Sequence, residues 1–165
     1  MKKTLAVAAL ALLASNAVAQ RVVRQAKITT PPSLTLLDTA GMFLQRYAKV
    51  GDDMFIGGQP TQKALRDMKA AGVTTVVNLR MPQEITVERI RFDEKAYVES
   101  LGMKYVHIPM RGGTGETAYS PANLAKFSEA MKTADGKVLL HCTIAWRASH
   151  IWGAYLIQQG VPDEA

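Results

Sequence analysis

A cysteine and an arginine five positions apart are the pair of residues best suited to chemistry in this chain. Cys142 is the only cysteine, and Arg147 follows it after Thr143, Ile144, Ala145 and Trp146. A cysteine thiolate is a strong nucleophile, and a nearby cation stabilises it relative to the thiol. An arginine can hold two oxygens of a tetrahedral anion at once. His141, directly before the cysteine, adds partial positive charge or orients the loop. The pattern favours Cys142 as a nucleophile that attacks a bound oxyanion. The alternative is that Cys142 is an inert thiol in the core.

This pair lies between a buried strand and a helix. Residues 137–141 are mostly apolar and predict the strand, and the residues after Arg147 predict a helix to about Gln159, ended by Gly160. In open α/β sheets, ligands bind beyond the carboxyl ends of the strands. The unpaired N–H groups at the start of a helix attract anions. The placement therefore predicts an anion site beside the cysteine.

Strands and helices alternate along most of the chain. Apolar or β-branched runs predict strands at residues 54–56, 73–79, 104–108 and 137–141. Helical periodicity predicts helices at 62–71, 92–101 and 121–132, with Thr61 and Ser120 as N-caps. Before them, residues 20–50 are the least regular segment, with one short helix expected at 41–47. This order predicts an α/β fold with a mostly parallel sheet flanked by helices.

The N-terminus has the pattern of a signal peptide. Lys2 and Lys3 precede an apolar run over residues 5–13, and Ala17 and Ala19 form a small-x-small cleavage site. The run is far shorter than the ~20 residues that a membrane-spanning helix needs. We expect residues 1–19 to be a signal peptide cleaved before Gln20, a lead-in segment at 20–50 and the main domain at 51–165. The mature chain would then be periplasmic or secreted; the alternative is an uncleaved amphipathic anchor.

Composition and net charge limit the classes of binding partner that we expect for this chain. Hydrophobic residues make up 48% of the chain and charged residues 21%, which is typical of a globular protein. Without the first two lysines the net charge falls from +6 to +4, and no block of basic residues indicates nucleic-acid binding. His107 and His150 have no spacing typical of metal ligands. We expect no cofactor, no metal, no nucleic-acid partner and no membrane span.

The last residues look like the beginning of another helix. Pro162 is followed by Asp163 and Glu164, and a proline followed by acids is typical of a helix N-terminus. We expect the natural chain to continue beyond Ala165; the alternative is a frayed tail.

Four segments together resemble one enzyme family. They are Gly57-Gly58-Gln59-Pro60-Thr61, Val76-Val77-Asn78-Leu79-Arg80, Tyr105-Val106-His107-Ile108-Pro109, and Leu139-Leu140-His141-Cys142 with Arg147. Over residues 55–159 the chain resembles the bacterial cysteine-dependent dual-specificity and tyrosine phosphatases called beta-lactamase hydrolase-like phosphatase domains. The resemblance implies hydrolysis of a phosphomonoester on a small molecule or a phosphoprotein, through a cysteinyl-phosphate. Cys142 would be the nucleophile, Arg147 the phosphate clamp and residues 143–146 the amide cradle.

The cysteine loop departs from the usual phosphatase pattern in three ways. Four residues, not five, separate Cys142 from Arg147, none of them is glycine, and Ala148 replaces the usual hydroxyl residue. A four-residue gap is similar to rhodanese-type sulfurtransferases, in which the cysteine carries a persulfide. Ile144 and Trp146 could fill the cradle, which leaves a third alternative: a degenerate module that binds a phosphoanion or a partner without turnover.

Two further residues are candidates for the site. The family takes its general acid from the loop after the strand at 104–108, where Glu116 is the one acid between Met110 and Ser120. Glu116 is therefore the candidate proton donor, on a flap hinged by nearby glycines; the alternative is a solvated loop glutamate. Arg80, at the end of another strand, is either a second anion contact or an ordinary salt-bridge arginine.

Overall fold

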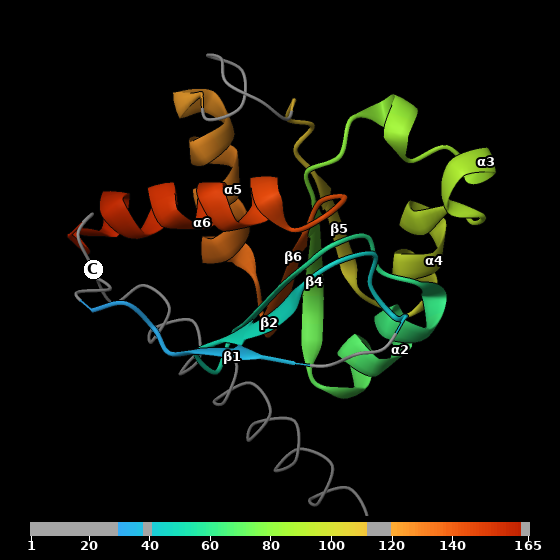
Figure 1. Cartoon of the computed structure of the whole chain (residues 1–165), viewed down its shortest axis with the longest axis horizontal. Coiled ribbons are helices and arrows are strands. Elements are labelled where there is room, and N and C mark those ends of the chain that lie inside the picture. The colour runs from blue at the N-terminus through green and yellow to red at the C-terminus, as the bar shows by residue number, and fades with distance from the viewer. Residues whose placement is uncertain (1–29, 38–40, 112–119, 163–165) are drawn as a thin grey trace, which may run out of the picture.

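The fold is a six-stranded sheet with helices on both faces (Figure 1). The computed structural model describes residues 30–37, 41–111 and 120–162. The strands are β1 (Leu34–Leu36), β2 (Tyr47–Val50), β3 (Met54–Gly57), β4 (Val73–Asn78), β5 (Lys104–His107) and β6 (Lys137–His141). Their order is β1-β2-β3-β6-β4-β5, and β3, β6, β4 and β5 run parallel. The predicted α/β class with a mostly parallel sheet is confirmed.

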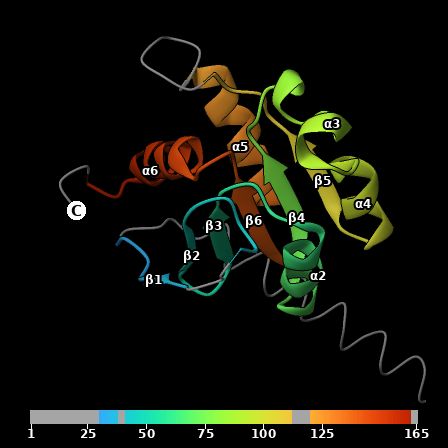
Figure 2. The same ribbon diagram turned by 45° about the vertical axis from the view of Figure 1, so that its right-hand side comes forward.

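The helices form two layers, one on each face of the sheet (Figure 2), and each layer covers its own hydrophobic core. On one face α2 (Gln62–Ala70) and α4 (Glu94–Ser100) cover apolar residues such as Val76 and Leu139. On the other, α5 (Pro121–Thr133) and α6 (Trp146–Gln159) cover Val138 and Leu140. Successive residues of β6 thus enter opposite cores, as a strand buried on both faces requires. No helix among the described residues is long and apolar enough to cross a membrane.

Local signals set the ends of the main helices. The Thr61 side chain accepts a hydrogen bond from the Ala64 N–H at 3.2 Å, and Ser120 caps α5 in the same way, with Pro121 in the first turn. Gly160 ends α6 in the left-handed region at φ 97°. These caps and ends agree with the sequence predictions.

The segment before β3 differs from its prediction. The helix expected at residues 41–47 is wrong: Tyr47 begins β2, which pairs antiparallel with β3, and β1 adds a further antiparallel strand. Aromatic packing explains the difference, because Phe43 stacks on Tyr47 at 4.3 Å and Tyr47 on Phe55 at 5.8 Å. Two short elements were also not predicted, a 3₁₀ turn η1 (Pro82–Glu84) and α3 (Val87–Ile90).

Three neighbouring parallel strands end at the same level of the sheet. Gly57 at the end of β3 and Asn78 at the end of β4 both pair with His141 at the end of β6. The chain leaves each strand at that edge. This register places the turns after β3, β4 and β6 side by side, and the candidate site is built from them.

Candidate active site

The cysteine loop is tied to the turn after β3. The Cys142 N–H donates to the Gly57 carbonyl at 3.3 Å, and the Gln59 N–H donates to the Thr143 carbonyl at 3.0 Å. A Cβ atom on Gly58 would lie 2.8 Å from that Thr143 carbonyl oxygen and closer still to Gln45. Only glycine allows this approach. Cys142 itself is buried, 1% exposed, directly after β6.

The loop makes its turn with an alanine where glycine is usual. Ala145 has φ 70° and ψ −9°, in the left-handed region, and precedes the first turn of α6. A residue with a Cβ is strained there, by about 1–2 kcal/mol. The missing glycine therefore does not prevent the turn. It leaves strain in the loop between the cysteine and the arginine.

Arg147 is held by a glutamate that the sequence prediction missed. Its Nη1 and Nη2 atoms donate to the two carboxylate oxygens of Glu84, each at 2.8 Å. The Thr143 hydroxyl donates to Glu84 Oε1 and accepts from Arg147 Nη2, both at 2.8 Å, and Nη1 also donates to the Met110 carbonyl. Glu84 thus joins the turn after β4 to the cysteine loop.

This contact shifts both pKa values. The hydrogen bonds from Arg147 are the largest cause that lowers the pKa of Glu84 from 4.5 to about 2, against the effect of burial. The same hydrogen bonds and the charge of Glu84 raise the pKa of Arg147 against the opposing effect of burial.

A buried polar network lies behind the cysteine. His141 Nε2 is 2.7 Å from Glu94 Oε1, and the two side chains are 0% and 1% exposed. Glu94 Oε2 accepts from Gln59 Nε2 at 2.9 Å and from Asn78 Nδ2 at 3.2 Å. Burial raises the pKa of Glu94, but the attraction of His141 and the hydrogen bonds from His141 and Gln59 outweigh it, so the pKa is lowered. The ring Nδ1 of His141 lies 3.4 Å from the Cys142 carbonyl oxygen, so the network reaches the loop backbone.

Arg80 faces this network and is not a surface residue. Its side chain is 7% exposed, and Nη1 donates to Gln59 Oε1. Its Nε atom lies 3.8 Å from Glu84 Oε1, too far for a hydrogen bond. The backbone N–H of Arg80 donates to Asn78 Oδ1 at 2.7 Å, which fixes the turn after β4.

Most predicted site residues meet here. His141, Cys142, Thr143, Ala145 and Arg147 gather at the end of β6 with Arg80 beside them. The side chains that the sequence suggested could fill the cradle do not lie in the core, since Ile144 is 45% exposed and Trp146 is 40% exposed. Glu116, with its glycine-rich flap, lies outside the described residues.

The sequence prediction missed Glu84 and Glu94. For Glu84 a partial signal existed: it follows Arg80 by four residues, in the turn after a buried parallel strand. Such a turn must lie at the same edge of the sheet as the cysteine loop. For Glu94 no signal existed, since an acid in the first turn of a helix is usually exposed and interacts only with the helix dipole.

Comparison with known proteins identifies the fold and the family. Residues 47–160 match the phosphatase-like domain of beta-lactamase hydrolase-like protein. The chain belongs to this phosphatase-like family. A beta-lactamase hydrolase-like protein of Xylella fastidiosa is 27% identical over 103 residues, which cover 62% of this chain. The match spans only 23% of that relative's length.

Solved phosphatase structures share the arrangement. A protein of Shewanella putrefaciens described as a phosphatase is 25% identical, with a TM-score of 0.53 over 79% of this chain and 71% of its own. Pseudomonas aeruginosa TpbA, solved with phosphotyrosine, has a TM-score of 0.56 at 15% identity, over 83% of this chain and 76% of its own. The domain is therefore phosphatase-like, with the fold of the cysteine-dependent phosphatases.

Replacing Glu84 by glutamine should make the protein less stable at neutral pH. The ionised carboxylate stabilises the fold above its ordinary pKa of 4.5, and this contribution is lost as the pH falls toward 2. Glu84→Gln is expected to lower the unfolding free energy at pH 7 by about 2–3 kcal/mol. Between pH 5 and pH 2, Glu84→Gln should therefore lose less of its unfolding free energy than the parent protein does. Urea unfolding at several pH values measures both effects, with the exposed Glu129→Gln as the control; equal pH profiles for all three proteins would contradict the assignment.

Replacing Ala145 by glycine should relieve the strained turn. Glycine adopts φ 70° without the Cβ clash, so Ala145→Gly is expected to be more stable by up to about 1 kcal/mol, despite the loss of a buried methyl group. Ala154→Gly, within α6, should instead cost about 0.5–1 kcal/mol. Thermal unfolding compares the two variants, and a similar destabilisation in both would argue against strain at Ala145.

Proposed function

We propose that this domain is a cysteine-dependent phosphatase that hydrolyses a phosphomonoester through Cys142. The observation that carries the proposal is the placement of Cys142 between the end of β6 and the start of α6, whose first turn carries Arg147. The first N–H groups of α6 have no partner within the helix and can bind phosphoryl oxygens. Membership of the phosphatase-like family supports the same reaction.

The proposed reaction has two displacements at phosphorus. The Cys142 thiolate attacks, a sulfur–phosphorus bond forms, and the ester bond breaks, so that the leaving oxygen takes up a proton. Water then attacks the cysteinyl-phosphate, the sulfur–phosphorus bond breaks, and inorganic phosphate and the thiolate are released. Arg147 and the amides of residues 143–146 would stabilise the charge on the transferred group. Glu116 is the proposed donor of the first proton.

The roles of Glu84 and Thr143 in this scheme are to position Arg147. Their hydrogen bonds fix the plane of the guanidinium before a substrate arrives. A positioned guanidinium loses less freedom when it binds an anion. Glu84 is therefore a positioning residue for the phosphate clamp.

An aryl phosphate is the proposed substrate type. TpbA, which shares the fold, was solved with phosphotyrosine. In this chain two exposed apolar side chains of the cysteine loop, Ile144 and Trp146, would border a bound aryl group. We also propose that the protein acts after export, in the periplasm or outside the cell, because the pattern of residues 1–19 is that of a signal peptide.

One observation favours a second candidate, a module that binds an anion without turnover. Both carboxylate oxygens of Glu84 occupy the two Nη atoms of Arg147, which a phosphoryl group would otherwise use. A phosphate that cannot displace Glu84 would bind only to the backbone amides and the remaining guanidinium edge. A sulfurtransferase, the other alternative, differs from both the phosphatase and the binding module because its product in the assay below is thiocyanate.

Cys142→Ser should abolish phosphate release. The full chain is assayed with an activated aryl phosphate, beside sulfur transfer from thiosulfate to cyanide. We expect phosphate release that falls at least ~1,000-fold in Cys142→Ser, because the hydroxyl is a much weaker nucleophile than the thiolate. Thiocyanate that depends on Cys142, without phosphate release, would replace the proposal with a sulfurtransferase. No product in either assay would favour the binding module, and activity unchanged by the substitution would rule out Cys142 as the nucleophile.

A further inference from the structure

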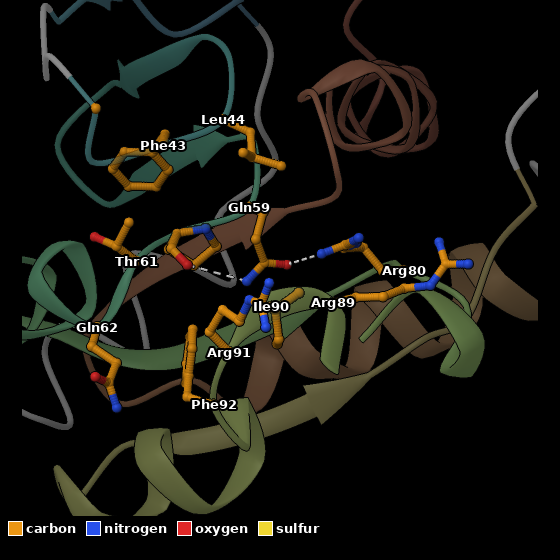
Figure 3. Close-up of a pocket in the computed structure, with 12 residues that line it drawn as sticks. Phe43, Leu44, Gln59, Thr61, Gln62, Arg80, Arg89, Ile90, Arg91 and Phe92 are labelled. Atoms are coloured by element: carbon orange, nitrogen blue, oxygen red, sulfur yellow. Dashed lines mark hydrogen bonds between the residues drawn. The ribbon is translucent and has the colours of Figure 1, made fainter. Parts of the chain in front are cut away.

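A cavity of about 420 Å³ adjoins the cysteine loop on the side of Gln59. It lies between the turn after β3, the start of α2 and the residues around α3 (Figure 3). Gln59 connects the cavity to the candidate active site, because its N–H donates to the Thr143 carbonyl and its side chain accepts from Arg80. Neither Cys142 nor Arg147 lines this cavity.

The described walls of the cavity carry positive charge. Arg80, Arg89 and Arg91 all line it, and among the described residues no aspartate or glutamate does. Among the described residues, neither Arg89 nor Arg91 forms an ion pair. In Figure 3 the Arg91 side chain reaches toward Gln59, whereas Arg89 extends away from it. Arg80 and Arg91 are therefore the groups best placed to meet an anion at Gln59.

Arg80 is a buried cation with one unpaired hydrogen-bond donor. Its side chain is more than nine-tenths buried, and its Nε atom has no hydrogen-bond partner among the described residues. The Glu84 carboxylate is 3.8 Å away and is held by Arg147 instead. A buried donor without a hydrogen-bond partner is costly. Arg80 also lines the cavity, so its guanidinium charge adds to that of Arg91 there.

Apolar side chains also line the cavity. They are Phe43, Leu44, Pro60, Ile90 and Phe92. Phe43 is fixed by its stacking on Tyr47. A cavity that combines two convergent guanidinium groups with aromatic and aliphatic walls suits a phosphate carried on an organic body, rather than a bare peptide carboxylate.

Arg91 is also held in an uncommon backbone conformation. It ends α3 with φ 70°, in the left-handed region, although it is not a glycine. Strain of this kind is concentrated at sites that bind ligands. Here it directs the chain so that Arg91 and Phe92 both border the cavity.

We propose that this cavity is a second phosphate site, in which Arg80 and Arg91 bind the phosphate and Phe43 and Phe92 contact its organic body. The phosphate belongs either to the substrate, as a second phosphate group, or to a separate organic phosphate that regulates the domain. Only the assignment to the substrate rests on the proposed function; binding in the cavity does not require turnover.

The test follows backbone amide signals of the full Cys142→Ser chain by NMR as inorganic phosphate is added. We expect the amides of residues 89–92 to shift and saturate, with a dissociation constant fitted separately from that of residues 143–147. Arg91→Gln should weaken the first constant about tenfold or more and leave the second unchanged. Lys132→Gln removes the same charge from an exposed residue of α5, on the opposite face of the sheet, and should change neither.

Two results would overturn the second site: no saturable shift at residues 89–92, or a shift that Arg91→Gln does not weaken. Absence of saturation at residues 143–147 alone would count against the proposed function and not against the cavity. A series of alkanediol bisphosphates then distinguishes the two sources of phosphate. A single bound molecule that saturates both sets of amides, more tightly than an alkyl monophosphate, would identify a substrate site. Independent binding of two molecules would identify a separate effector, and both results support the phosphate site.

Discussion

The register of three parallel strands is the constraint on which the site depends. Gly57, His141 and Asn78 lie opposite one another at the ends of β3, β6 and β4. Because of this alignment, three turns from distant parts of the sequence meet at one edge of the sheet. Each supplies something different: a backbone that permits close approach at Gly58, a nucleophile at Cys142 and two charged groups at Arg80 and Glu84. A shift of one residue in any pair would separate these groups and turn the strand's core residues to the wrong face.

Buried polar groups then fix the turns in place. Glu94 comes from α4, yet it reaches His141 and receives hydrogen bonds from Gln59 and Asn78, one residue from each of the other two turns. A carboxylate with several partners in a dry environment specifies geometry strongly, because loss of any one partner leaves a charge uncompensated. Glu84 has the same function for Arg147. Each acid thus holds one basic residue of the site, Glu94 holding His141 and Glu84 holding Arg147.

The sequence predicted much of this fold for clear physical reasons. The strand at residues 137–141 and the helix that starts at Gln62 stand out because hydrophobic period and capping residues agree there. The strand at 47–50 was not predicted, since its inward side chains are recognisable only once Phe43 and Phe55 are known to stack on Tyr47. Cys142, Arg147 and Arg80 were found from their place after strands. Glu94 was not, because its burial depends on a tertiary contact with His141 that local sequence does not encode.

The left-handed backbone at Ala145 also indicates what determines the conformation of the cysteine loop. A loop whose own residues preferred this conformation would adopt it in isolation, but an alanine there does not. The conformation is imposed by the neighbouring turns and by α6, so the ordering entropy of the loop is lost during folding rather than during binding. The affinity of the loop for an anion is thus set in part by distant packing. Evolution can tune such a site through substitutions that never touch the ligand.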